Sequence, residues 1–240
     1  MCTATFLPYK NGFLLTHNRD EFVGRPLALP PQTYTHTNEL GEKLQLTYPK
    51  DPKGGGTWIL ISEKFTLCLL NGAFVPYVPT PPYRRSRGLV LLDFFDYQNI
   101  EKFAANYNLV GIEPFTLWVV ENNLENDTNN MPLEFVEFRW DSQKLHQTKL
   151  DSKATHIRSS TTLYTPEIIQ NRETWFRQWL QENPNYDDKQ IINFHLFGGQ
   201  NDENINLVMQ RKDKLTVSIT AISKYEKENN MVYKDLVAVK

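Results

Sequence analysis

Cys2 is the residue of this sequence that is best placed to do chemistry. Methionine aminopeptidases remove Met1 when the next side chain is small, so Cys2 would then carry the α-amino group of the chain. A free α-amine has a pKa of roughly 7.7–8.0 and a thiol one of about 8.5. One residue would therefore hold a nucleophile and a base that accepts a proton near neutral pH.

The charged partners that such a thiol needs follow in the tetrapeptide Asn18-Arg19-Asp20-Glu21. A Cys thiolate that attacks an amide carbonyl requires a nearby cation or base to keep it ionised, and Arg19 supplies a permanent positive charge. A carboxylate could orient the new α-ammonium group. Adjacent side chains of a strand point to opposite faces, so either a bulge brings Asp20 around or Glu21 takes the acidic role. We favour Asp20; the alternative to a site is a surface salt-bridge cluster at a strand end.

Two short β-rich runs, Thr3–Leu7 and Phe13–His17, would position these groups. The Asn11-Gly12 step between them is the strongest short-range hairpin signal. We therefore expect the two strands to pair and to bring Arg19 close to Cys2.

A second hairpin is predicted from Trp58–Ile61 and Phe65–Leu70, which are apolar at nearly every position. This pattern is typical of strands covered on both faces. The preceding glycines, 54–56, are not followed by the Lys-Ser/Thr of a phosphate loop, and we expect them to allow close backbone approach, with Trp58 buried behind. Asn71 ends the hairpin. Its amide could donate to a developing oxyanion, or it could simply form a turn with Gly72.

The rest of the chain alternates groups of strands with groups of helices. We expect a surface excursion at 32–53 with one or two short strands and a proline-rich loop at 75–82. The expected helices are 84–97, 99–106, 166–183 and 187–197, and the further strands are 115–120, 133–140, 144–148, 206–210, 215–222 and 231–239. Hairpin connections favour an α+β fold of antiparallel sheets stacked between helices, in one domain spanning 1–240.

Composition excludes several classes of function. The net charge is −2, with 26 basic and 28 acidic residues, so there is no electrostatic footprint for nucleic acid. No stretch approaches the ~20 apolar residues of a membrane helix. The two cysteines, Cys2 and Cys68, are poor evidence for a disulfide framework, which favours a reducing, cytoplasmic location. The five histidines lack metal-ligand spacing, so we expect no metal and no resident cofactor. The oligomeric state stays open.

Several short motifs together resemble the NRDE family, which is named for its tetrapeptide and includes the transport and Golgi organisation protein 2 group. The matching segments span about residues 1–220 in order: Met1-Cys2, residues 18–22 with Arg25-Pro26, Gly55-Gly56-Thr57-Trp58, Arg85-Ser86-Arg87-Gly88, Ser159-Ser160-Thr161 with Leu163-Tyr164, and Thr216-Val217-Ser218-Ile219-Thr220.

The resemblance implies an N-terminal-nucleophile hydrolase fold with four layers in the order αββα, similar to the choloylglycine hydrolase and acid amidase group. By position, Cys2, Arg19 and Asp20 match the nucleophile, the Arg and the Asp of those enzymes. Those amidases, however, separate the Arg and the Asp by two residues, whereas here the two are adjacent.

Further positions match less closely. Asn71 resembles the oxyanion Asn, and Arg211 could match a late active-site Arg. Ser159 and Ser160 lie roughly where the amidases carry a second Asn; a serine can donate a hydrogen bond but offers no amide. Trp58, Ser160 and Arg211 are our candidate substrate-binding residues.

Two functions from different classes follow. The first is a Cys-nucleophile hydrolase acting on a linear amide C–N bond of a small apolar or acyl substrate. The second is a non-catalytic protein on the same scaffold that binds or traffics haem or an acyl lipid, because a Cys thiolate can also ligate haem iron. A degenerate hydrolase without surviving chemistry is a third possibility.

Overall fold

The computed structural model describes residues 2–97, 99–122, 134–225 and 228–237. The chain forms two compact units, one containing Met1–Arg25 and Lys153–Lys240 and the other Pro26–Ser152. Each unit combines an antiparallel sheet with helices. The predicted α+β class with antiparallel sheets is therefore confirmed, whereas the single domain over 1–240 stays a prediction.

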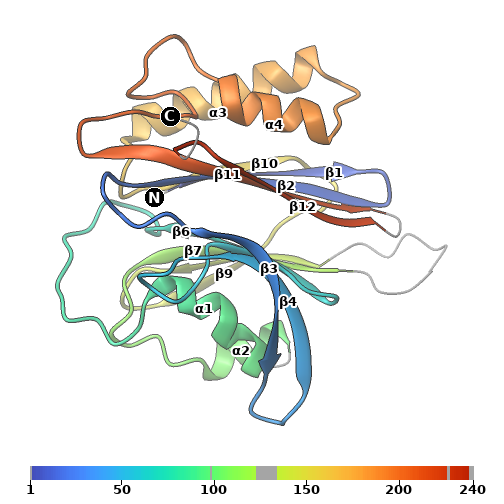
Figure 1. The fold of residues 1–240 in the computed structure, drawn as a ribbon, viewed down its shortest axis with the longest axis vertical. Coiled ribbons are helices and arrows are strands. Elements are labelled where there is room, and N and C mark those ends of the chain that lie inside the picture. The colour runs from blue at the N-terminus through green and yellow to red at the C-terminus, as the bar shows by residue number, and fades with distance from the viewer. Residues whose placement is uncertain (1, 98, 123–133, 226–227, 238–240) are drawn as a thin grey trace. The chain divides into compact units, whose positions relative to one another are not determined.

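The first unit contains a five-stranded sheet with the order β10-β1-β2-β11-β12, in which every neighbouring pair is antiparallel. Helices α3 and α4 lie along one face of this sheet (Figure 1). The strands are β1 (Cys2–Tyr9), β2 (Gly12–Phe22), β10 (His156–Ser159), β11 (Lys214–Tyr225) and β12 (Glu228–Asp235), and the helices are α3 (Pro166–Glu182) and α4 (Asp188–Phe197).

The predicted N-terminal hairpin is confirmed, but its turn differs in detail. Tyr9 pairs with Gly12, so the two turn residues are Lys10 and Asn11 rather than Asn11 and Gly12, and Lys10 has a φ of 49°. The glycine is needed for another reason: a Cβ on Gly12 would lie 1.9 Å from the backbone oxygen of Lys224 on β11. Gly12 therefore permits close packing of β2 against β11.

Both helices of this unit begin where capping residues predict. The Thr165 side chain accepts a hydrogen bond from the backbone of Ile168 at the start of α3, and Pro166 occupies the first turn. Asp187 and Gln190 form a capping box at the start of α4. The helices bury an apolar face against β1 and β2 through Leu7, Leu14, Ile157, Trp175, Phe176, Ile191, Phe194 and Leu207.

The second unit contains a seven-stranded antiparallel sheet with the order β3-β4-β5-β6-β7-β8-β9. Its strands are β3 (Leu29–Thr37), β4 (Lys43–Lys50), β5 (Ile59–Ile61), β6 (Phe65–Asn71), β7 (Phe115–Glu121), β8 (Phe135–Trp140) and β9 (Leu145–Lys149). The segment 32–53, where we expected one or two short strands, contains two strands of nine and eight residues that belong to the sheet. Thr33 pairs with Thr47 across this hairpin, and the rings of Tyr34 and Tyr48, which are diagonal neighbours, stack on one another.

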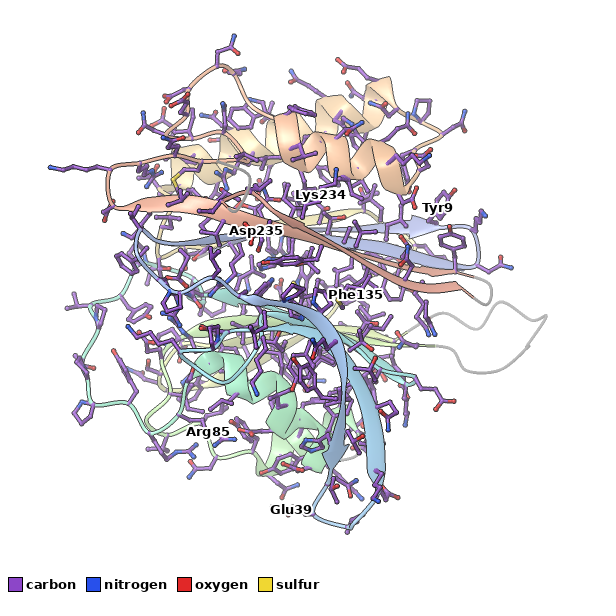
Figure 2. All side chains as sticks on the ribbon, viewed as in Figure 1. Tyr9, Glu39, Arg85, Phe135, Lys234 and Asp235 are labelled. Carbon is purple, nitrogen blue, oxygen red and sulfur yellow. The ribbon has the colours of Figure 1, made fainter. Side chains whose placement is uncertain are left out.

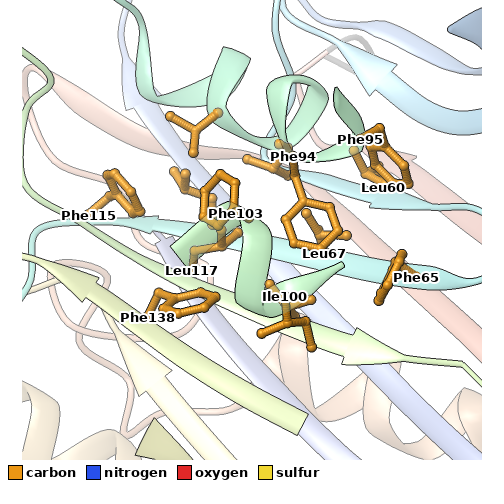
Figure 3. Packing of buried hydrophobic residues seen from close by; sticks show 14 of the residues in the cluster. Leu60, Phe65, Leu67, Phe94, Phe95, Ile100, Phe103, Phe115, Leu117 and Phe138 are labelled. Atoms are coloured by element: carbon orange, nitrogen blue, oxygen red, sulfur yellow. The ribbon is translucent and has the colours of Figure 1, made fainter. Parts of the chain in front are cut away.

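Helices α1 (Arg87–Asp93) and α2 (Ile100–Asn106), joined by the short 3-10 helix η1 (Phe94–Asp96), pack on one face of this sheet. The core between them is rich in aromatic rings: Phe94 contacts both Phe65 and Phe103 (Figure 3). The glycine run does allow close backbone approach, because a Cβ on Gly56 would lie 2.3 Å from the backbone of Gly88 in α1. That these glycines lie at the mouth of the site stays a prediction. The loop at 75–82 has no regular secondary structure, as predicted.

Two predictions about strands were wrong. Residues 206–210 form no strand and contribute a single bridge between Gln210 and Leu215. The carbonyl oxygens of Asn206 and Leu207 instead accept hydrogen bonds from the side chains of Arg172 in α3 and Asn18 in β2. Strand β10, a short edge strand, was missed. Position 133 and positions 238–239 of the predicted strands lie outside the described residues.

Candidate active site

Cys2 and Arg19 are direct partners in the antiparallel pairing of β1 with β2. Residues directly opposite one another on antiparallel strands project from the same face of the sheet. The hairpin therefore places Cys2 and Arg19 directly opposite one another on the same face of the sheet, although they are seventeen residues apart in the sequence. Ser160 lies on the other side of Cys2, and its backbone N–H donates to the Cys2 carbonyl oxygen at 2.8 Å.

The four residues of the Asn-Arg-Asp-Glu tetrapeptide alternate between the two faces of β2. Arg19 and Glu21 share the face of Cys2, and their side chains form an ion pair with an Nη2–Oε2 distance of 3.4 Å. Glu21 also pairs with Arg25 at 3.3 Å. Asn18 and Asp20 point to the helix-covered face, where Asn18 Nδ2 donates to the carbonyl oxygens of His195 and Leu207 at 3.0 and 2.8 Å.

Asp20 is buried in a network of hydrogen bonds on the helix side. Its carboxylate accepts hydrogen bonds from the Tyr164 hydroxyl and from Thr216 Oγ1, the latter at 2.6 Å. Burial raises the pKa of the Asp20 carboxyl, and the positive charge of Arg172 is the largest effect that opposes the rise. The carboxylate of Asp20 thus bonds to Tyr164 and Thr216 on the helix-covered side of the sheet, while that of Glu21 contacts Arg19.

The Cys2 side chain is 4% exposed. Burial raises the pKa of its thiol, and the negative charge of Asp20 adds to the rise. A hydrogen bond from the backbone of Asp20 acts in the opposite direction, because an N–H donor favours the thiolate. The surroundings of the thiol therefore combine effects that favour the thiolate with burial and the charge of Asp20, which favour the neutral thiol.

The sequence predicted strands at 215–222 and 231–239, but not that they lie on the far side of Arg19. Arg19 pairs with Ser218 on β11, and Ser218 pairs with Asp235 on β12, so a row of polar side chains runs across the sheet from Cys2 (Figure 2 labels Asp235). A register shift lies between Thr216 and Ser218. This bulge lets Thr216 bond to Asp20 on the helix side while Ser218 shares the face of Arg19.

Tyr233 lies on β12 next to this row, opposite Thr220. Burial raises the pKa of the Tyr233 hydroxyl and so does Asp235, whereas Ser218 and the charge of Arg19 lower it. The phenol is therefore within electrostatic range of Arg19. In the sequence, the only signal for this part of the sheet is the alternation of polar and apolar residues in Thr216-Val217-Ser218-Ile219-Thr220.

Arg211 lies against the helix-side network. Its Nε donates to the Asn204 carbonyl oxygen at 2.9 Å and its Nη1 to that of Leu163 at 3.3 Å, and its guanidinium carbon is 5.6 Å from the centre of the Tyr164 ring. The guanidinium is thus engaged with backbone carbonyls of its own unit. Its role in binding substrate stays a prediction.

Asn71 and Trp58 belong to the second unit. Asn71 is the last residue of β6, opposite Phe115, and Gly72 after it has a left-handed φ of 88°, so a turn does end the strand here. Trp58 is buried beside β6, where its carbonyl oxygen accepts a hydrogen bond from Leu69 at 2.8 Å. Their proposed roles at Cys2 stay predictions.

A cavity of about 300 Å³ lies in the second unit, between the turn joining β5 to β6, strand β4 and η1. Phe65, Phe94 and Phe95 line its apolar side, and none of the predicted site residues lines it. Within the described residues, no group of three or more His, Cys, Asp or Glu side chains could hold a metal ion. In the same residues no helix has the length and apolar character to cross a membrane.

The fold and the site thus define an α+β protein whose first strand carries a Cys directly opposite an Arg on the second strand. The sequence model of the Transport and Golgi organisation 2 family matches residues 1–233, and the chain belongs to this family. The resemblance noted from the short motifs is therefore confirmed.

A search of curated proteins finds no match. Among solved structures, the chain is similar to a variant of conjugated bile acid hydrolase from Clostridium perfringens. The TM-score is 0.49 at 10% sequence identity, and the alignment covers 98% of this chain and 92% of that one.

Proposed function

We propose that this protein is a hydrolase that uses Cys2 to cleave a linear amide C–N bond of a small apolar or acyl substrate. The observation that supports this most strongly is the pairing of Cys2 with Arg19 across β1 and β2. A thiol next to a fixed guanidinium is a common arrangement for a reactive cysteine, because the positive charge favours the thiolate.

The proposed reaction has two halves. With Met1 removed, the α-amine of Cys2 accepts the thiol proton as the sulfur attacks the amide carbonyl carbon. The α-ammonium then gives this proton to the amide nitrogen, the C–N bond breaks, and the amine leaves behind a thioester on Cys2. Water attacks the thioester, its proton passes to the α-amine, and the breaking C–S bond releases a carboxylic acid and restores the thiol.

Arg19 is assigned to stabilise the thiolate, and Glu21 holds the guanidinium by the ion pair at 3.4 Å. We expected an acidic partner that orients the α-ammonium group and favoured Asp20 over Glu21; Glu21 is supported for that role because its side chain lies on the face of Cys2. For Asp20 we propose a contribution through its backbone N–H, which bonds to the Cys2 sulfur. Asn71 is proposed to donate to the oxyanion, and Trp58, Ser160 and Arg211 to bind the substrate.

Both cysteines are free thiols. A reducing compartment such as the cytoplasm, which we propose for this protein, would keep the nucleophile available.

Labelling with an electrophilic acyl-amide probe tests the proposal. We expect the full chain to gain one acyl group on Cys2, and Cys2→Ala to gain none. Cys68→Ala is the matched control, since Cys68 is also a buried free cysteine but lies in the second unit, and it should be labelled like the parent. Equal labelling of Cys2→Ala and the parent would contradict the proposal.

Haem binding is the outcome that would favour the non-catalytic alternative. Titration of the parent and of Cys2→Ala with haem separates the two functions. A Soret shift that is lost in Cys2→Ala, together with no acyl transfer from the probe, would replace the hydrolase with a haem-binding protein.

A further inference from the structure

Helix α3 reaches the immediate surroundings of Cys2 through Arg172, a residue that is completely buried. Its Nη1 donates to Oγ1 of Thr3, the residue that follows Cys2, at 2.5 Å. Its Nε and Nη2 donate to the carbonyl oxygens of Ile205 and Asn206 at 3.1 and 2.5 Å. The guanidinium therefore fixes β1 one residue from the sulfur, and each acceptor that it bonds to is neutral.

A second path runs through Tyr164, just before α3. The guanidinium carbon of Arg172 lies 3.7 Å from the centre of the Tyr164 ring. The hydroxyl of the same tyrosine donates to the carboxylate of Asp20, which Thr216 also holds at 2.6 Å. The backbone N–H of Asp20, on the strand paired with that of Cys2, favours the Cys2 thiolate.

The two paths have an electrostatic consequence. A buried carboxylate beside a sulfur disfavours the thiolate, since the two negative charges repel one another. The positive charge of Arg172 counteracts that of Asp20. A buried guanidinium costs several kcal/mol in desolvation unless it is well bonded, and an apolar side chain at this position would not carry that cost.

We infer that Arg172 and Tyr164 are positioning residues for the Cys2 nucleophile. They hold Thr3 on one side of the sulfur and the backbone N–H of Asp20 on the other. The inference rests on the proposed function in that it takes Cys2 as the reacting group. Neither residue touches the reacting atoms, and both act through Thr3 and Asp20.

Tyr164→Phe removes a single hydroxyl from this network and tests the inference. The readout is the pH profile of Cys2 alkylation by iodoacetamide in the full chain, followed by peptide mass spectrometry. We expect alkylation at pH 7 to slow by about three- to tenfold and the midpoint to move to higher pH, because the N–H of Asp20 is no longer held against the thiolate.

Tyr186→Phe is the matched control. Its hydroxyl donates to the carbonyl oxygen of Pro8 at 2.6 Å and so ties the opposite end of β1 to the helix layer. This variant should keep the parental profile. Cys68, which is completely buried, reports unfolding in the same digest. If Tyr164→Phe exposes Cys68, Thr216→Val removes the other hydrogen bond to the same carboxylate, and the same shift is expected.

An unchanged Cys2 profile in a folded variant, or one moved to lower pH, would overturn the inference. Hydrolysis of the acyl-amide probe by the parent is measured separately. A shifted profile without any hydrolysis would leave the positioning role standing and refute the proposed function. Hydrolysis of the probe together with an unshifted alkylation profile would support the proposed function and refute the positioning role.

Discussion

The two faces of strand β2 make different use of one tetrapeptide. On one face, Arg19 and Glu21 form an ion pair beside Cys2. On the other, Asn18 bonds to His195 and to the carbonyl of Leu207, and Asp20 bonds to side chains of the helix layer. The alternation of a strand thus lets four consecutive residues serve both the site and the packing of the unit. The comparison predicts that substitutions on the helix side reduce stability, whereas those on the Cys2 side change thiol reactivity.

The largest effect is expected for Arg172→Met on the helix side. The substitution leaves the carboxylate of Asp20 buried without its compensating charge and removes three hydrogen bonds. Each buried acceptor that is left without its donor costs about 1–3 kcal/mol, so the three together should cost about 3 kcal/mol or more. Urea denaturation at pH 7 should show a decrease of this size in the free energy of unfolding.

Arg19→Met is the matched control for this loss. Arg19 and Glu21 are largely buried, but Glu21 keeps a second ion pair with Arg25, so the free energy of unfolding should fall by only about 1.5–3 kcal/mol. A loss for Arg19→Met as large as that for Arg172→Met would erase the distinction between the two faces.

His195 makes the helix side sensitive to acid. Its ring bonds to Thr5 and Asn18, and burial, with a smaller contribution from Arg172, lowers its pKa to about 3. The unfolded chain has a His pKa of about 6.5, so it binds a proton as the pH falls below that value while the folded chain does not. The free energy of unfolding should therefore fall by about 2 kcal/mol between pH 7 and pH 5.

This dependence is measured by urea denaturation at the two pH values. His195→Gln should lose it, whereas His146→Gln, which changes a half-exposed histidine of the second unit, should keep it. If the free energy of unfolding of His195→Gln still falls between pH 7 and pH 5 as in the parent, a group other than His195 is responsible.

On the Cys2 side, Arg19→Met should change reactivity. Loss of the guanidinium removes the cation opposite the sulfur, so the pKa of the thiol rises and alkylation of Cys2 at pH 7 slows by about tenfold. Alkylation of urea-unfolded protein gives the reference rate. Equal rates in the folded parent and the folded variant would show that Arg19 does not act on the thiol.

The smallest effect is expected for Glu21→Gln. The substitution frees Arg19 from its carboxylate, so the guanidinium favours the thiolate more and the alkylation rate of Cys2 should rise by about twofold. Stability should change by less than about 1 kcal/mol, as is usual for partly exposed ion pairs. A slower rate would mean that Glu21 is needed to hold Arg19 in place.

The sequence predicted the part of the site that depends on local structure. The hairpin of β1 and β2 follows from a short turn between two β-rich runs, and a two-residue turn fixes the register that sets Cys2 opposite Arg19. The start of α3 was likewise predicted from neighbouring residues alone, the capping Thr165 and Pro166. The family followed from the motifs between these elements.

The rest depends on contacts between distant parts of the chain. The bulge that puts Ser218 beside Arg19 arises where β11 meets β2, about two hundred residues apart, and no local signal marks it. Arg172 lies in the amphipathic helix α3, and a charged residue of such a helix is normally expected on its exposed face. It is buried because Thr3 and the carbonyl groups of 205–206 supply its acceptors.

The state of the N-terminus tests the central claim most directly, because the proposed nucleophile needs the α-amine of Cys2 as its proton acceptor. Mass spectrometry of the intact protein and of its N-terminal peptide measures this. The account predicts a chain that starts at Cys2, with a free α-amine and a free thiol. A chain that keeps Met1 would contradict it, since the α-amine would then lie on the wrong residue.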